Sequence, residues 1–236
     1  MDYKQITDLI SKSKKKTPAK VYIQGNFEED YFKEQDFNTF GEGSFWILIG
    51  DYPLIERWLE RNKERIKNLY VELDARYSAL PLLDLRKVDA RIEPGAMVRD
   101  GAQIGKDCII MMGAVINIGA QVGQETMVDM NAVIGARAII GQNCHIGAGA
   151  VIAGVLEPPS KSPVIIEDNV LVGANAVVLE GIKVGRGSVV AAGAVVLEDV
   201  LPNFVVAGVP AKVIRKVEDI LQKEKIAIVK SLRKRE

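Results

Sequence analysis

The chain has 236 residues, of which 48% are hydrophobic, enough for a substantial core within one or two domains. Lysine plus arginine equal aspartate plus glutamate at 31 each, so charge gives no case for nucleic acid or a membrane as partner. The sequence has no evident signal peptide or long apolar span, and we expect a soluble, cytoplasmic protein.

Residues 1–87 do not carry the repeat found further on, and they predict a small α/β domain. Asp2 to Ile10 has the pattern of a short amphipathic helix. The basic run from Ser11 to Lys16 (SKSKKK) follows, and we interpret it as the solvated end of that helix.

Two strands and a second helix are expected in the rest of this domain. Val21 to Ile23 has the pattern of a strand, and Phe45 to Ile49 is an apolar run bounded by Gly43 and Gly50, as a buried strand is. Asp51 then stands where an N-cap precedes a helix. An apolar stripe predicts that this helix runs for four turns, through Leu54, Ile55, Trp58, Leu59, Ile66 and Leu69.

Residues 88–210 repeat with a period of six. Aliphatic residues recur at Ile92, Val98, Ile104, Ile110, Ile116, Val122, Val128, Ile134, Ile140, Ile146, Ile152, Ile166, Val172, Val178, Val184, Val190 and Val196. A helix would repeat on 3.6 residues and an exposed strand on two, so this period belongs to neither. Hexapeptide repeats indicate a parallel β-helix, and seventeen repeats at three per coil predict about six coils.

Small residues stand four places after most of these aliphatic residues, where the chain must turn a corner. Cys108 and Cys144 occupy such positions, so we interpret both as packing residues that form neither a disulfide framework nor a metal cluster. Glycines directly after the aliphatic residue are expected to supply positive φ at the corners: Gly105, Gly123, Gly135, Gly141, Gly147, Gly173 and Gly185.

The repeat is interrupted at residues 153–165, which contain three prolines and must leave the β-helix as a loop. Ile152 and Ile166 are fourteen residues apart, two more than two repeats. Such a loop commonly lies on the binding face, although a tolerated surface insertion is the alternative. Beyond Val200 we expect a covered extended segment, and then, within the final segment 211–236, a C-terminal helix from Val217 to Glu236.

One stretch narrows the class of β-helix. Glu125 to Pro159 contains TMVD, GQNCHIG and GVLEP, and VIIEDNV and GANAVVLEG follow. This block resembles the tetrahydrodipicolinate N-acyltransferases of the diaminopimelate route to lysine, which are hexapeptide-repeat enzymes. The short chain and the N-terminal sequences VYIQG and FGEGSFWILIGDY resemble the branch that uses acetyl-CoA. The resemblance implies a left-handed β-helix, a homotrimer with its sites between adjacent prisms, and a small dicarboxylate substrate.

The resemblance also suggests catalytic residues. Asp129 matches an aspartate that binds or deprotonates the substrate amine in the succinyl branch, although aspartates also favour turns. His145 is the only histidine, and many hexapeptide acyltransferases use a histidine as general base. A structural role for this histidine is the alternative. A single histidine and two corner cysteines cannot supply the three-histidine zinc site of hexapeptide carbonic anhydrases, so no metal is expected.

Arg137 and Arg99 are candidates for binding the substrate carboxylates, because a guanidinium binds a carboxylate bidentately; exposed surface charge is the alternative. The succinyl branch has a glutamate within its version of GANAV, where this chain has Val177. Glu180 remains nearby as a candidate for substrate binding, but a mechanism with two carboxylates does not transfer directly.

Coenzyme A is expected along the outer wall of the late coils. Small residues there would let the pantetheine arm lie close, and a lysine resembles a basic residue near the coenzyme phosphates: Gly173, Ala191, Ala192, Gly193 and Lys212. Ordinary turn packing is the alternative for all five. Other functions that remain open are a succinyl-CoA-dependent enzyme of the same step, a sugar or serine acetyltransferase, and a β-helix scaffold without activity.

Overall fold

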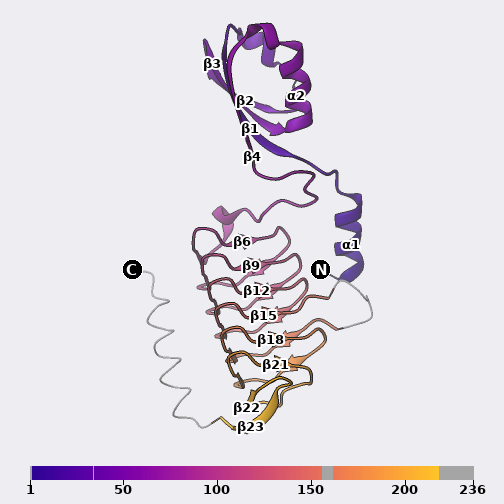
Figure 1. Ribbon diagram of the computed structural model, residues 1–236, viewed down its shortest axis with the longest axis vertical. Coiled ribbons are helices and arrows are strands. Elements are labelled where there is room, and N and C mark those ends of the chain that lie inside the picture. The colour runs from indigo at the N-terminus through magenta and orange to yellow at the C-terminus, as the bar shows by residue number, and fades with distance from the viewer. Residues whose placement is uncertain (1, 34, 156–161, 218–236) are drawn as a thin grey trace. The chain divides into compact units, whose positions relative to one another are not determined.

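The computed structural model describes residues 2–33, 35–155 and 162–217. The chain divides into two compact units, one comprising Met1–Leu9 with Pro81–Glu236 and the other Ile10–Leu80 (Figure 1). The first helix, α1 (Tyr3–Lys12), contributes residues to both. No helix among the described residues is long and apolar enough to cross a membrane.

The smaller unit is an antiparallel four-stranded sheet with a helix. Its strand order is β2-β3-β1-β4, and its elements are β1 (Pro18–Gly25), η1 (Glu29–Phe32), β2 (Asn38–Glu42), β3 (Phe45–Asp51), α2 (Tyr52–Arg61), η2 (Lys63–Arg65) and β4 (Ile66–Leu73). Alternate residues of β1 and β3, such as Val21 and Leu48, are buried with Ile55 and Trp58 of α2. The first helix and both expected strands are confirmed, and each strand extends beyond its predicted residues.

The predicted extent of the second helix is wrong. α2 ends at Arg61, and Ile66 and Leu69 belong to β4, where Leu69 pairs with Ile23 of β1. The helical spacing of Ile66 and Leu69 is coincidental. Hydrogen bonding of this segment to β1 stabilises a strand here more than helix propensity stabilises a helix. Asp51 does precede α2, but its carboxylate accepts a hydrogen bond from the Thr17 amide at 2.8 Å and makes no capping bond to the helix.

The larger unit confirms the predicted mainly β solenoid. After η3 (Leu85–Lys87), each of the seventeen aliphatic residues is the second residue of a two-residue strand. These strands are β5 (Arg91–Ile92), β6 (Met97–Val98), β7 (Gln103–Ile104), β8 (Ile109–Ile110), β9 (Val115–Ile116), β10 (Gln121–Val122), β11 (Met127–Val128), β12 (Val133–Ile134), β13 (Ile139–Ile140), β14 (His145–Ile146), β15 (Val151–Ile152), β16 (Ile165–Ile166), β17 (Leu171–Val172), β18 (Val177–Val178), β19 (Lys183–Val184), β20 (Val189–Val190) and β21 (Val195–Val196).

Every third strand pairs in parallel, which produces a prism with three faces (Figure 1). The first face contains β5, β8, β11, β14, β17 and β20, the second contains β6, β9, β12, β15, β18 and β21, and the third contains β7, β10, β13, β16 and β19. We call the turns from the first face to the second the first edge, those from the second to the third the second edge, and those from the third to the first the third edge.

The aliphatic and small residues fill the interior as predicted. Ile116, Ile134 and Val172 have no exposed surface, and neither do the corner residues Ala132 and Cys144. At about 0.8 kcal/mol for each buried methylene group, this stack of branched side chains is the main stabilising contribution of the coils. Each coil buries its apolar surface only against its neighbours, as a solenoid requires.

The predicted role of the glycines is wrong. Positive φ occurs three residues after the aliphatic residue, for example at Gly113 (74°) and Asn131 (57°), and not at the glycines that follow it directly. Those glycines are needed because successive coils touch there. A Cβ atom on Gly105 would lie 2.5 Å from the Gln124 amide nitrogen, and one on Gly173 would lie 2.4 Å from that of Ala192.

The interruption is also arranged differently from the prediction. β16 follows β15 directly in the coil and pairs with β13, so one repeat separates them, not two. Fourteen residues therefore comprise one hexapeptide and eight inserted residues. The insertion leaves at the second edge; residues 156–161 lie outside the described residues.

The chain ends its described part with two further strands on the first face, β22 (Phe204–Ala207) and β23 (Lys212–Lys216). The segment after Val200 is extended, as predicted, but β23 is not covered: Val213 and Ile214 are more than half exposed. The C-terminal helix predicted from Val217 to Glu236 lies, apart from Val217 itself, outside the described residues.

Candidate active site

Asp129 and His145 lie together at the first edge. Met127 of β11 pairs with His145 of β14 on the next coil, so Asp129, two residues after Met127, follows the strand beside the histidine. The Asp129 Oδ2 and His145 Nε2 atoms are 3.8 Å apart, and the side chains are 18% and 26% exposed. The other aspartate oxygen, Oδ1, accepts a hydrogen bond from the Met130 amide at 2.8 Å, which fixes the carboxylate.

The separation of 3.8 Å is too long for a direct hydrogen bond, yet it suits a shared partner. A single nitrogen atom could lie about 2.9 Å from both Oδ2 and Nε2 and bond to each. An amine placed there would face a carboxylate that binds its N–H and an imidazole that can accept its proton. Both side chains are partly exposed on the outside of the prism.

A column of small residues continues from this pair along the first edge. Gly147, Gly173 and Ala191 occupy the turn position of Asp129 on the three following coils, and Ala192 and Gly193 complete the last of these turns. With coils about 4.8 Å apart, Gly173 and Ala191 lie roughly 10 and 14 Å from Asp129. Four of the predicted coenzyme residues thus share an edge with the predicted catalytic pair. Gly147 was missed, although adding the coil length of eighteen residues to position 129 would have found it.

The remaining predicted substrate residues are not brought to this pair within one chain. Arg99, Arg137 and Glu180 all lie in turns of the second edge. Arg137 has a left-handed backbone (φ 65°), and its Nη1 atom donates to the Val155 carbonyl oxygen, 3.4 Å away, at the base of the inserted loop. Lys212 begins β23, where its ammonium group lies 3.8 Å from the Glu198 carboxylate.

The N-terminal helix packs against the second edge beside Arg137. Ile6 of α1 is fully buried, and a Cβ atom on Gly119 would lie 2.6 Å from its Cδ1 atom. The same Cβ would lie 3.5 Å from the Cγ atom of Arg137. The helix therefore supports the turn that carries this arginine.

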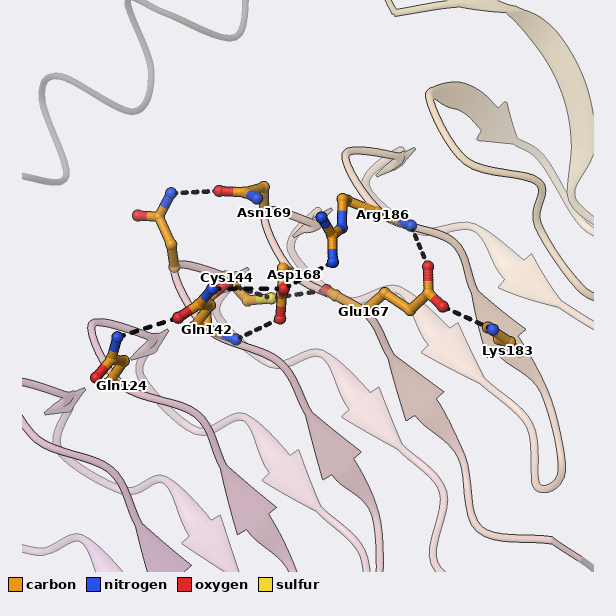
Figure 2. Close-up of polar contacts among 9 residues, drawn as sticks. Gln124, Gln142, Cys144, Glu167, Asp168, Asn169, Lys183 and Arg186 are labelled. Atoms are coloured by element: carbon orange, nitrogen blue, oxygen red, sulfur yellow. Dashed lines mark hydrogen bonds and ion pairs between the residues drawn. The ribbon is translucent and has the colours of Figure 1, made fainter.

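The third edge differs, because its long polar side chains bond to each other (Figure 2). Asp168 accepts hydrogen bonds from the Gln142 amide at 3.1 Å and from the Arg186 guanidinium at 3.2 Å. Glu167 forms an ion pair with Lys183 at 2.6 Å, and this contact, followed by the Arg186 amide, lowers the pKa of Glu167 below its usual value. Burial raises the pKa of the Cys144 thiol to about 11, so it stays neutral as a packing residue.

No group of three or more His, Cys, Asp or Glu side chains within the described parts of the chain could hold a metal ion. At the first edge, the Asp129 carboxylate and the His145 imidazole are the side chains that the described residues bring together.

Comparison with known proteins decides the family. Residues 1–85 match the family model described as tetrahydrodipicolinate succinyltransferase N-terminal. Residues 119–154 match the model described as bacterial transferase hexapeptide (six repeats), and residues 163–198 match the model described as hexapeptide repeat of succinyl-transferase. A 2,3,4,5-tetrahydropyridine-2,6-dicarboxylate N-acetyltransferase from Caldanaerobacter subterraneus subsp. tengcongensis is 66% identical over 97% of this chain and 94% of that protein. The chain belongs to this N-acetyltransferase family. A member from Thermosipho africanus is 63% identical over 99% of both chains.

Within the family, relatives carry the acetyltransferase name, although the N-terminal family model is named after a succinyltransferase. Among solved structures, a histidine-to-alanine mutant of GDP-perosamine N-acetyl transferase from Caulobacter crescentus, in complex with CoA and GDP-perosamine, has a TM-score of 0.50 and 28% identity. The match covers 54% of this chain and 57% of that one.

Proposed function

We propose that this chain transfers the acetyl group of acetyl-CoA to the amine derived from 2,3,4,5-tetrahydropyridine-2,6-dicarboxylate, giving N-acetyl-2-amino-6-oxopimelate in lysine and diaminopimelate biosynthesis. The family carries the assignment of this activity, since relatives of that name match nearly the whole chain. The placement of Asp129 and His145 at the head of a column of small residues supports the same reaction.

In the proposed reaction the cyclic imine takes up water and opens to a primary amine. The amine nitrogen lies between Asp129 and His145 and attacks the thioester carbonyl carbon, forming the C–N bond. His145 accepts the proton that the nitrogen loses, and Asp129 binds the remaining N–H. The C–S bond then breaks, and the departing CoA thiolate takes up the proton, which completes the exchange.

Acetyl-CoA is proposed to lie along the first edge, with Gly147, Gly173 and Ala191 leaving room for its pantetheine arm. Holding the thioester beside the amine supplies much of the rate, because the reaction becomes effectively unimolecular. Lys212, which lies beyond the small residues on β23, is proposed to approach the coenzyme phosphates.

Arg137 and Arg99 can bind the substrate only from a second copy of the chain. Arg137 and Arg99 lie on the second edge, so they reach a substrate at Asp129 only if the second edge of one subunit faces the first edge of another. We infer a homotrimer in which this pairing occurs three times around a closed ring. Arg137 and Arg99 then bind the substrate carboxylates, and Glu180 lies in the same turns.

A thiol-release assay tests the reaction. The purified chain should release CoA thiol from acetyl-CoA in the presence of the cyclic imine dicarboxylate, and far more slowly from succinyl-CoA. Use of succinyl-CoA alone would refute the assigned donor, and activity on a nucleotide-linked amino sugar alone would refute the acceptor.

Mixing two inactive variants tests the shared site. Asp129→Asn and Arg137→Ala damage different edges, so co-refolded hybrid trimers should recover about one quarter of the wild-type rate, because each site draws its edges from two subunits. Each variant refolded alone should stay inactive. A mixture with no more activity than its components would refute the trimeric site.

A further inference from the structure

The smaller unit contains a cavity that the acetyl-transfer reaction does not use. It has a volume of about 670 Å³ and is lined only by residues between positions 14 and 74, none of which belongs to the β-helix. This volume lies within the range of about 300–1,000 Å³ that small-molecule sites occupy. Its charged lining residues are Lys14, Lys16, Lys20, Asp36, Asp51 and Asp74.

The basic run at the start of the chain supplies two of these lysines, because the backbone there is extended. Lys16 and Ser78 exchange backbone hydrogen bonds of 3.0 and 2.7 Å, so the residues on either side of Lys15 face the same way. Lys14 and Lys16 line the cavity, while the Lys15 ammonium donates to carbonyl oxygens of Ile10 and Ser13 at the end of α1. The interpretation of the run as a solvated helix end therefore holds for Ser11 and Lys12, which end α1 and are exposed, and for Lys15, which bonds to that end, whereas Lys14 and Lys16 line the cavity.

The charged side chains that line the cavity, all of which the structure describes, do not form ion pairs with one another. The Asp51 carboxylate already has a partner, because it accepts a hydrogen bond from the Thr17 backbone amide. Within the described residues, no hydrogen bond or ion pair engages the ammonium groups of the three lysines or the carboxylates of Asp36 and Asp74. Three cationic and two anionic groups thus face one hollow, with apolar surface from Phe37, Ile49 and Leu54 between them.

We propose that this cavity binds a small zwitterionic ligand of the α-amino acid class. The lysines would bind its carboxylate and Asp36 or Asp74 its ammonium group, since opposite charges at hydrogen-bond distance form the stronger class of polar contact. A ligand with a carboxylate but no ammonium would leave the two aspartates opposed to it, and a simple amine would meet three lysines. The apolar part of the lining fits a side chain of moderate size.

Calorimetric titration of the full chain with each of the common L-amino acids tests the assignment. At least one should bind with a Kd below about 1 mM. Acetate, methylamine and inorganic phosphate, which each carry only one kind of charge, should bind at least about tenfold more weakly. The proposal fails if none of the amino acids binds, or if phosphate binds as tightly as the best of them.

Variants of the basic run locate the site. Lys14→Gln combined with Lys16→Gln should weaken binding of that amino acid about tenfold or more, whereas Lys15→Gln, the matched control, should leave it unchanged. Both proteins should keep the wild-type melting temperature and thiol-release rate, which shows that they fold. Equal weakening in the two proteins would overturn the location. Failure here leaves the acetyl-transfer proposal intact, because the two sites share no residue.

Discussion

The first and third edges of the prism are built by the same hexapeptide turn, yet they carry opposite kinds of side chain. The third edge bears long polar residues that bond from coil to coil, such as Gln142 with Asp168 and Lys183 with Glu167. Along the first edge, Gly147, Gly173 and Ala191 leave the outer wall bare beside Asp129. On the third edge the polar side chains bond to each other, whereas on the first edge the outer wall beside Asp129 and His145 carries small residues.

The largest difference between the edges should appear in turnover. Asp129→Asn should lower kcat by about 10²–10⁴-fold while CoA still binds, because the amide cannot replace a carboxylate in binding the amine. Asp168→Asn makes the same chemical change on the third edge and should leave kcat within about twofold of wild type. Steady-state thiol release measures both, and a nearly full rate for Asp129→Asn would remove that residue from the mechanism.

The next largest difference should appear in the KM for acetyl-CoA when a large side chain is placed on the outer wall of each edge. Ala192 is exposed on the first edge, so Ala192→Trp should raise KM for acetyl-CoA at least about tenfold, or ~1.4 kcal/mol, by blocking the wall. Gln124→Trp adds comparable bulk to the third edge and should leave KM unchanged. Equal KM values for the two variants would place the coenzyme elsewhere.

A third change concerns the stacking that all edges share. Gly105→Ala places a Cβ atom 2.5 Å from the Gln124 amide nitrogen, which should cost about 1–3 kcal/mol of unfolding free energy. Gly95→Asn is the control: no atom lies closer than 3.8 Å to the new Cβ, and asparagine tolerates the positive φ of 83°. Denaturant unfolding compares them; equal losses would contradict contact between coils as the reason for Gly105.

The smallest effect concerns acid stability of the third edge. Because the folded pKa of Glu167 lies below its usual value of 4.5, ionised Glu167 stabilises the fold above about pH 4.5. That contribution is lost as the pH falls through the lower, folded pKa. Glu167→Gln should therefore show a shallower fall of melting temperature below pH 4.5 than wild type. Parallel curves for the two proteins would show that the ion pair with Lys183 adds nothing.

The sequence predicts what depends on short-range repetition. Seventeen aliphatic positions and their buried corners follow from a strict period, because every coil presents the same environment to Ile134 as to Val172. Contacts between residues far apart in the sequence are not all predicted by the period. The reason for Gly105 lies eighteen residues away at Gly123 and Gln124, and the fate of Leu69 depends on pairing with Ile23.

The candidate site also contains one feature that the period predicts and one that the motifs alone do not. Asp129 and His145 are sixteen residues apart in the sequence, and the coil length brings them together at 3.8 Å. The separation of Arg137 from that pair could not be read from motifs, because both lie in one matched block. It follows from counting turns, since 129 falls after a strand of the first face and 137 after a strand of the second.

The eight inserted residues leave the ladder on both sides of them in register, since Ile139 still pairs with Ile165 and Ile140 with Ile166. A longer or shorter excursion at this point would change the closure entropy by only a few tenths of a kcal/mol and would leave the interior untouched. A change in the length of this segment is therefore tolerated by the coils on either side of it.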